Sequence, residues 1–424
     1  MILAPIVPTR EKELRALLAS MNEGIGRVNP TNKLIPFASF DNLHFARLLI
    51  LDDKTTVDIS AYGLKAKPYP LYLAFLGDID GEEDRFLLGL ERRASDGLRK
   101  LFSCCKDFYP DTNLITWMRK HRAPSIANYV NSRGRTVRRI HQEAKLYEAI
   151  QKCLENDPSL RNSPPREIHA KLVQLLYNEI ASVRLTLFAE NTPTFWRVRN
   201  LLHLVCIPLL VLILLPLLIL FLPLYIRLLR KLEKTDPEIC FPVDQAYTEM
   251  LSNGEDYDVT NQFSAMGSLK PGLVRLLTTI GVLSTVDYAA RHITRPGWLG
   301  RIRTIHFARW VFLDGMKRMI FCSNYDGSVE SYMDDFINRT GFGLNASFSN
   351  GIGYPRTNWL FLDGCANERK YKEYLRRHTL PTQVWYKAYP GLTAVDLERH
   401  ERIRKGLETE YLSDQELAEW LALL

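Results

Sequence analysis

Two stretches of the chain show the apolar-polar alternation of a half-buried strand and share most of their letters. HFARLLILD runs from His44 to Asp52 and HFARWVFLD from His306 to Asp314; six of nine positions are identical and the others exchange one apolar residue for another. Their content of aromatic and branched residues predicts two strands. The period of two places His306 on one face of its strand and Arg309 on the other.

The similarity continues in the same order beyond these strands. Asp80-Gly81 matches Asp326-Gly327 and Gly97-Leu98 matches Gly343-Leu344, both at a spacing of 246 residues. Four ordered matches indicate a duplicated unit that covers residues 36–155 and 296–410. Two copies are too few for a solenoid, in which three or more repeats stack, so we expect a pseudo-twofold pair. The remaining matches are Tyr109-Pro110 with Tyr354-Pro355 and, at a spacing of 257, His121, Pro124 and Tyr129 with His378, Pro381 and Tyr386.

Each unit is predicted to belong to the α+β class, with helices on one face of a mostly antiparallel sheet. Two such sheets packed face to face would form a pseudo-twofold α+β barrel built from tandem ferredoxin-like-type repeats. In the second copy, the strand 302–314 is expected to be followed by a turn and strand over 315–327, a helix over 328–340, a strand over 343–349, a helix over 367–378, a strand over 382–390 and a helix over 394–408.

One segment is too apolar for a soluble surface. Leu204–Ile226 contains 23 residues without a charge, a length typical of a membrane segment. Three prolines interrupt it, at 208, 216 and 223, and basic residues flank both ends. The basic residues are Arg197, Arg199, Arg227, Arg230, Lys231 and Lys234.

The repeat constrains how this segment meets a membrane. A single span would place the two copies on opposite sides, and basic residues at both ends disagree with one crossing. Two spans need about 40 residues. We therefore expect a re-entrant hairpin kinked near Pro216, with a single span and a buried core helix as alternatives. The predicted organisation is a helix and lead-in (1–35), first repeat (36–155), helical connector (156–203), membrane hairpin (204–226), linker and helix (227–295), second repeat (296–410) and C-terminal helix (411–424).

Composition narrows the compartment and the partners. The 424 residues are 46% hydrophobic and 24% charged, which is ordinary globular composition, and the net charge is +7. This basicity suits an anionic membrane surface, whereas no basic run with interleaved aromatic residues points to nucleic acid. Seven cysteines without a CxxC pair predict a reducing compartment. We expect the cytoplasmic face of a bacterial inner membrane, with membrane lipid as a partner.

The repeat also duplicates a set of polar side chains. Two interpretations remain open for it: ion pairs between strands, Arg47 with Asp80 and Arg309 with Asp326, or a site for an anion or a haem propionate, because Arg makes bidentate contacts with carboxylates. The set contains His44 and His306, Arg47 and Arg309, Asp80 and Asp326, and His121 and His378.

The strings IHFARWVFLD, FCSNYDGSVESYMDDFI and VWYKAYPGLT resemble a largely uncharacterised family of bacterial membrane-associated proteins. More remotely, GDIDG at Gly77–Gly81 is similar to the GxxDG motif of dye-decolorising peroxidases, which have two ferredoxin-like halves. This resemblance implies that Asp80 acts as an acid beside haem with Arg47 as its partner, and that a distant histidine, His306 or His378, ligates the iron. The second copy, SNYDG, departs from the motif with Ser323 in place of glycine.

Three functions follow from these patterns. The first is a membrane-associated, peroxidase-like oxidoreductase that uses haem on a lipid or other apolar substrate. The second is a non-catalytic lipid-binding or transfer protein, and the third is a scaffold subunit bound to a membrane protein. The site is predicted at Asp326, Arg309, Asp80 and Arg47 as catalytic residues, with His306 and His378 as cofactor ligands. We expect the second copy to be the more functional, because it adds Trp310, Trp385, Glu330, Asp334 and Asp335.

Overall fold

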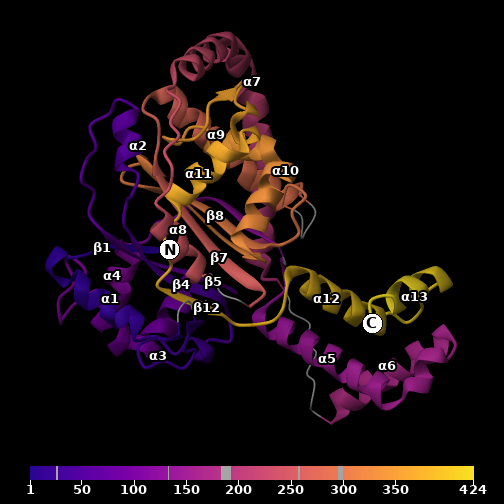
Figure 1. Ribbon diagram of the computed structural model, residues 1–424. Coiled ribbons are helices and arrows are strands. Elements are labelled where there is room, and N and C mark those ends of the chain that lie inside the picture. The colour runs from indigo at the N-terminus through magenta and orange to yellow at the C-terminus, as the bar shows by residue number, and fades with distance from the viewer. Residues whose placement is uncertain (25–26, 132, 183–191, 256–257, 295–298) are drawn as a thin grey trace.

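The computed structural model describes residues 1–24, 27–131, 133–182, 192–255, 258–294 and 299–424 (Figure 1). The chain alternates short strand groups with helices, and the predicted α+β class is confirmed. The strands are β1 (Ile2–Pro5), β2 (Asn22–Gly24), β3 (Arg27–Val28), β4 (Leu43–Leu51), β5 (Tyr72–Ile79), β6 (Ser125–Val130), β7 (Thr260–Ser268), β8 (Ile305–Leu313), β9 (Arg318–Asp326), β10 (Thr357–Asn358), β11 (Leu362–Asp363) and β12 (Val384–Lys387). The α-helices are α1 (Glu11–Ala19), α2 (Thr56–Ala61), α3 (Glu83–Phe102), α4 (Leu114–Lys120), α5 (Val137–Asn156), α6 (Pro165–Ala181), α7 (Thr194–Thr235), α8 (Gln245–Asn253), α9 (Leu273–His292), α10 (Val329–Phe348), α11 (Glu368–His378), α12 (Ala394–Glu408) and α13 (Asp414–Leu421).

Two four-stranded antiparallel sheets form the centre of the molecule. Their strand orders are β1-β5-β4-β12 and β7-β9-β8-β6, so equivalent strands of the two copies occupy equivalent positions. Neither sheet closes on itself within the described residues. The order is the same in both sheets, as a duplicated unit requires.

The fourth strand of each sheet comes from the other copy. β12 belongs to the second copy but pairs with β4 of the first, where Tyr386 lies opposite Ala46. β6 belongs to the first copy but pairs with β8 of the second, where Tyr129 lies opposite Ala308. The two registers are therefore equivalent, and each sheet is completed by a strand that the other unit contributes.

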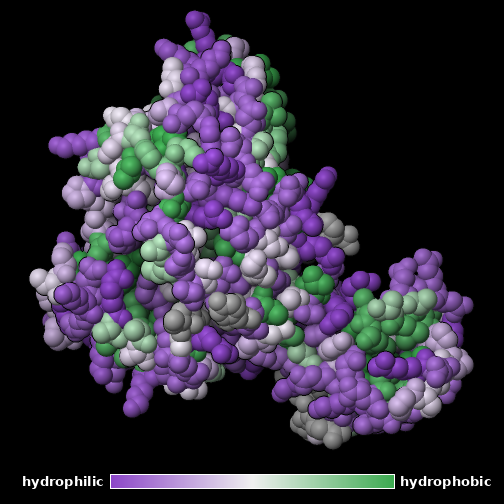
Figure 2. All heavy atoms as spheres, in the orientation of Figure 1, coloured by the Kyte–Doolittle hydropathy of each residue, from purple (hydrophilic) through white to green (hydrophobic). Residues whose placement is uncertain are grey.

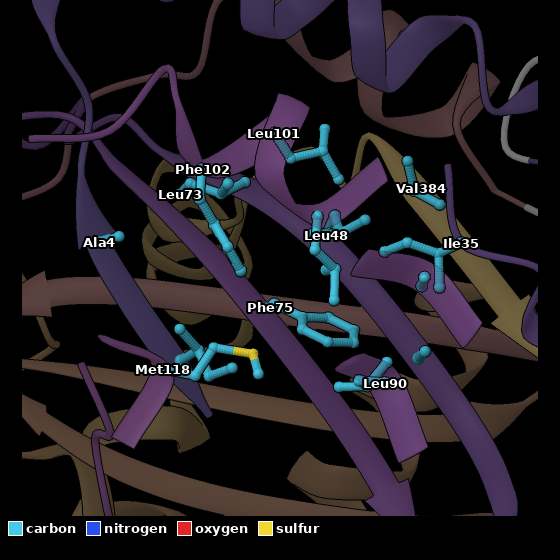
Figure 3. Close-up of a cluster of buried hydrophobic side chains, with 14 of the residues drawn as sticks. Ala4, Ile35, Leu48, Leu73, Phe75, Leu90, Leu101, Phe102, Met118 and Val384 are labelled. Atoms are coloured by element: carbon cyan, nitrogen blue, oxygen red, sulfur yellow. The ribbon is translucent and has the colours of Figure 1, made fainter. Parts of the chain in front are cut away.

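Four layers result from this arrangement. Helices α1, α3 and α4 cover the outer face of the first sheet, where Leu48 of β4, Phe75 of β5 and Val384 of β12 share one apolar cluster (Figure 3). Helices α9, α10 and α11 cover the outer face of the second sheet. The inner faces pack on each other through a cluster that includes Leu49 of β4 and Ile320 of β9.

A separate lobe is built from α5, α6, α12 and α13 (Figure 1). Leu146, Leu172 and Trp420 belong to its apolar core. Since α5 follows β6 and α12 follows β12, the two exchanged strands each lead into this lobe.

Three sequence expectations differ from the structure. Ile2–Pro5 and Thr260–Ser268, expected as lead-in and linker, are the strands β1 and β7 that begin each unit. Residues 343–349, expected as a strand, continue helix α10 to Phe348. The predicted start of the second copy at residue 296 lies outside the described residues.

The predicted hairpin is wrong, because α7 is one continuous helix of 42 residues with Pro208, Pro216 and Pro223 inside it. Its most apolar window is not buried at all, so the alternative of a core helix is also wrong. Two helices, α7 and α9, are long and apolar enough to cross a membrane by length and composition alone. A third of the α9 window is buried, and α9 packs on β6 of the second sheet.

The exchange of strands predicts that both sheets unfold together. Trp385 of β12 is 4% exposed and stacks on Phe45 of β4 with ring centroids 5.4 Å apart. Trp385→Ala should lower the free energy of unfolding by about 3–5 kcal/mol, because a large core side chain leaves a cavity. Urea unfolding in detergent, followed by circular dichroism, should show one transition shifted as a whole.

The matched control is Tyr109→Ala, because Tyr109 is an aromatic residue that is 62% exposed. Its effect should stay within about 0.5 kcal/mol. Two separate unfolding transitions in the Trp385 variant, one for each sheet, would show that the units are independent.

Candidate functional site

Each copy contains a histidine-aspartate pair at the end of its two central strands. His44 Nε2 lies 2.9 Å from Asp80 Oδ1, and His306 Nε2 lies 2.7 Å from Asp326 Oδ1. All four residues belong to the predicted set, and the structure brings them together in matching pairs. The hydroxyl of Tyr389 lies 3.1 Å from His44 Nδ1, and its ring is also near His306.

The second carboxylate oxygen of each aspartate accepts a hydrogen bond from the first residue of a helix. Val137 N at the start of α5 donates to Asp80 Oδ2 at 2.8 Å, and Ala394 N at the start of α12 donates to Asp326 Oδ2 at 2.7 Å. A carboxylate at a helix N-terminus satisfies a free N–H group and complements the helix dipole. Each pair therefore fixes the point where an exchanged strand turns into the helical lobe.

The two arginines do not contact these aspartates. Arg309 pairs with Asp78 of the first copy, and Arg47 donates to the side chain of Asn324 of the second copy. The predicted ion pairs Arg47–Asp80 and Arg309–Asp326 are thus wrong. Each arginine reaches across the space between the sheets instead of along its own sheet.

Arg47 is the more completely buried of the two. It also donates to the carbonyls of Phe263 and Ser323, both at 2.8 Å, and to Ser264 Oγ at 2.9 Å. Burial lowers the pKa of Arg47 from its ordinary value. Since the guanidinium carries several donors in a rigid fork, Arg47 ties β4 to both β7 and β9.

Asp78 and Asn324 meet at the centre and were missed in the sequence. They occupy equivalent positions, 246 residues apart, and Asn324 Nδ2 donates to Asp78 Oδ2 at 2.8 Å. An aspartate at both positions would bring two carboxylates into contact, which disfavours their charged forms. Aligning GDIDG with SNYDG shows Asp78 opposite Asn324, so the sequence already contained the difference from which this contact could have been predicted.

His378 lies apart from the two histidine-aspartate pairs. Its Nδ1 is 2.8 Å from the Tyr374 carbonyl, and Nε2 lies 4.0 Å from Asp58 Oδ2. Burial lowers the pKa of His378. Its first-copy equivalent His121 bonds Trp117 O in the same way at 2.9 Å. This repeated bond to the carbonyl four residues earlier closes the end of a helix in each copy.

The geometry does not fit a haem at either predicted ligand. The cavity beside His378 has a volume of about 30 Å³, which is room for about one water molecule. A Cβ added at Gly267 would approach the His378 ring to 2.6 Å, so this wall is closely packed. His306 is 2% exposed and its Nε2 is engaged by Asp326. Within the described ranges, no group of three or more His, Cys, Asp or Glu residues is placed to hold a metal.

The aromatic and acidic residues that were expected to make the second copy the more functional one pack in the core or form ion pairs instead. Trp310 and Trp385 are each 4% exposed and pack in the apolar clusters. Asp334 pairs with Lys372, Glu330 pairs with Arg376, and Asp335 pairs with Arg339.

Comparison with protein-family models, curated proteins and solved structures finds no match to this chain.

The contact between Arg309 and Asp78 predicts a stability effect. Their side chains are 18% and 10% exposed, so Arg309→Ala leaves an unpaired charge that is largely buried. We expect the free energy of unfolding to fall by about 3–5 kcal/mol. Adding Asp78→Asn should recover much of this loss, because the unpaired carboxylate is removed as well. Chemical denaturation of the single and double variants measures both effects.

Arg339→Ala is the matched control, because Arg339 and Asp335 form an ion pair at 2.8 Å with the arginine 53% exposed. Its loss should cost less than about 1 kcal/mol. If Arg309→Ala behaved like this control, the central contact would contribute little to stability.

Buried neutral histidines predict acid sensitivity. Burial lowers the pKa of His400 to about 4, from the ordinary 6.5. As pH falls below about 6.5 the unfolded chain takes up a proton that the folded protein accepts only near pH 4, so stability falls across this window. His400→Phe, which keeps the ring stacked on Tyr147, should make the slope shallower by up to about 1.4 kcal/mol per pH unit. Identical slopes of ΔG against pH in both proteins would contradict this role.

Proposed function

We propose that this protein is a monotopic membrane protein, held on a lipid surface by α7 and acting there as a non-catalytic lipid-binding protein. The observation that supports it is the apolar surface of α7. Its uncharged run is exposed on all sides, with Ile213 66%, Leu217 53% and Leu220 70% exposed. Monomeric soluble proteins rarely expose apolar surface of this extent. Figure 2 shows part of it as green spheres along the edge of the upper end of the molecule.

Both ends of the apolar run contact the same helix of the body. At the first end, the Tyr288 hydroxyl donates to Leu204 O at 3.0 Å, and His203 Nδ1 lies 2.9 Å from His292 Nε2. At the second end, the Tyr225 hydroxyl lies 2.9 Å from Thr278 Oγ1. A helix that is bonded at both ends to one body does not separate that body into two halves across a bilayer.

The spacing of these contacts indicates a curved helix. The 21 residues from Leu204 to Tyr225 span about 31 Å of straight helix, while the ten residues from Thr278 to Tyr288 span about 15 Å of α9. Prolines inside a helix allow it to bend away between the contacts. From either contact to Pro216 the helix measures about 14–18 Å, so it inserts no deeper than about one leaflet of a hydrocarbon core about 30 Å thick.

The polar centre favours a binding role over an oxidoreductase. Asp80 and Asp326, the predicted acids, each use both oxygens to hold a histidine and a helix N-terminus. A general acid must present its proton to a substrate. The oxidoreductase and scaffold functions stay predictions, and the visible spectrum of the purified protein tests the first of them.

We further propose that each unit is a ferredoxin-like repeat with an exchanged last strand. Apart from the short β2–β3 hairpin and helix α2, the element order of the first unit is strand, helix, two strands, helices and strand, and β1 pairs with β5. The residues before each exchanged strand still contact the first strand of their own unit: Leu3 N donates to His121 O, and Leu380 N donates to Ser264 O, both at 2.8 Å.

The test of membrane attachment is flotation with liposomes. The double variant Ile213→Asp and Leu217→Asp places two charges in the apolar run, each costing about 2.5–3.5 kcal/mol at the centre of a bilayer. The wild type should float with the vesicles, and the variant should remain in the dense fraction. Cysteines introduced at Arg199 and Lys234 in a cysteine-free background should both react only from the cytoplasmic side.

Leu88→Asp is the control, because Leu88 is 40% exposed on α3, at the opposite end of the molecule from α7 (Figure 1). It should float as the wild type does. Equal flotation of the α7 variant, or cysteines that react from opposite sides, would exclude a monotopic α7.

A further inference from the structure

A polar cavity lies where the apolar run of α7 ends. Its volume is about 570 Å³, and Arg230 and Lys234 of α7 line it together with Arg356 and Lys370. Within one helix, Arg230 lies about 6 Å and Lys234 about 12 Å beyond Ile226, the last residue of the apolar run. Each headgroup layer adds about 5–8 Å to a bilayer, so Arg230 lies at headgroup depth when α7 is inserted. Lys234 lies about one helical turn further out, where its long side chain can extend back toward the lipid.

The charges around the cavity leave a small positive excess. Glu238 lies 2.8 Å from Lys370 Nζ and 3.7 Å from Arg356 Nε, and it is partly exposed. The Lys234 side chain is exposed and makes no hydrogen bond or ion pair within the part of the chain that the structure describes. Four cations face three carboxylates, those of Glu233, Glu238 and Asp363. The excess of one charge complements a single phosphodiester.

One of these carboxylates is committed to the protein itself. Glu233 is 1% exposed and accepts from Leu360 N at 2.7 Å, Thr357 Oγ1 at 3.1 Å and Trp359 N at 3.2 Å. It also pairs with Arg230. Glu233 therefore fixes the β10–β11 hairpin against the end of α7 and is not a free acceptor for a cation.

The hairpin held by Glu233 presents an aromatic rim. Trp359 is 53% exposed, Leu362 is 54% exposed, and the Arg230 guanidinium lies 4.6 Å from the Trp359 ring. Trp359 and Leu360 have φ of 55° and 67°, a costly conformation for residues with a side chain. Tryptophan is enriched at membrane interfaces, where its ring reaches both apolar and polar layers.

We propose that this cavity binds the phosphate of an anionic membrane phospholipid, with Lys234 and Arg356 as its main cationic contacts and the acyl chains against α7. The proposal rests on the membrane attachment proposed above. The phosphate takes the place of Glu238 beside Arg356, and Trp359 packs at the level of the glycerol. The cavity therefore gives a preference for negatively charged lipid, whereas α7 alone would bind any bilayer through its apolar surface.

The experiment compares vesicles of phosphatidylcholine with vesicles of equal parts phosphatidylcholine and phosphatidylglycerol. The wild type should bind the anionic vesicles more tightly. The double variant Lys234→Gln and Arg356→Gln should lose about 10- to 30-fold in affinity for the anionic vesicles and keep its affinity for phosphatidylcholine. Native mass spectrometry of the wild type in detergent should show one retained phosphatidylglycerol, which the variant lacks.

The matched control is Arg227→Gln with Lys231→Gln, which removes the same charge from the same helix end outside the cavity. This control variant should lose about threefold or less in affinity for the anionic vesicles. Equal losses in both double variants would overturn the cavity in favour of general surface charge, and so would retention of lipid by the pocket variant. Displacement of the lipid by inorganic phosphate at equal concentration would identify a site for free phosphate instead.

Two failures remain distinguishable. If the wild type floats with neither vesicle, membrane attachment itself is wrong. If it floats equally with both vesicles and retains no phosphatidylglycerol, attachment stands and the cavity is not a lipid site. The mass measurement on the wild type needs no variant, so it decides the question even when a substitution prevents folding.

Discussion

The exchange of β6 and β12 is the constraint on which the rest of the structure depends. Each sheet has three strands from one unit and its fourth from the other, so neither sheet is complete alone. The exchange holds both units on one side of any membrane that the chain meets. It also sets the position of the helical lobe, because α5 and α12 follow the exchanged strands directly. The membrane attachment proposed above, through a helix bonded at both ends to one body, keeps both units on the same side.

The buried polar contacts between the two sheets also join one unit to the other. Buried charges are tolerated when they are paired and hydrogen-bonded, and here the partners come from opposite units: Arg309 with Asp78, and Arg47 with Asn324. Exact symmetry would place two carboxylates in contact at the axis. The replacement of one by Asn324 turns repulsion into a hydrogen bond, so a small break in the repeat stabilises the pairing that the repeat creates.

The sequence revealed the duplication and the α+β class, but not how the strands of the two units connect. The repeated letters around His44 and His306 predicted equivalent strands, and the mixed helix and strand patterns predicted the class. Sequence similarity within a unit says nothing about which unit a strand joins, so the exchange and the crossing arginines were missed. Residues 343–349 are mostly small or polar, and their helical state depends on packing in α10. Thr260–Ser268 alternates weakly, yet it forms nine paired residues with β9. The continuous α7 was mistaken for a hairpin because the pairing of the two copies and the basic residues at both ends favoured a return near Pro216, whereas all three prolines lie inside one helix.

The order of synthesis gives the exchanged strands a consequence for folding in the cell. Val130 ends β6, and Val384 begins its counterpart β12, 254 residues later. At ribosomal rates of about 5–20 residues per second, about 10–50 s separate the two. During that interval the edge of β4 is without β12, and an open strand edge is prone to pair with other chains. Helix α7 leaves the ribosome within the same interval, so the lipid attachment proposed above would remove the half-made protein from the crowded solution before its first sheet can be finished.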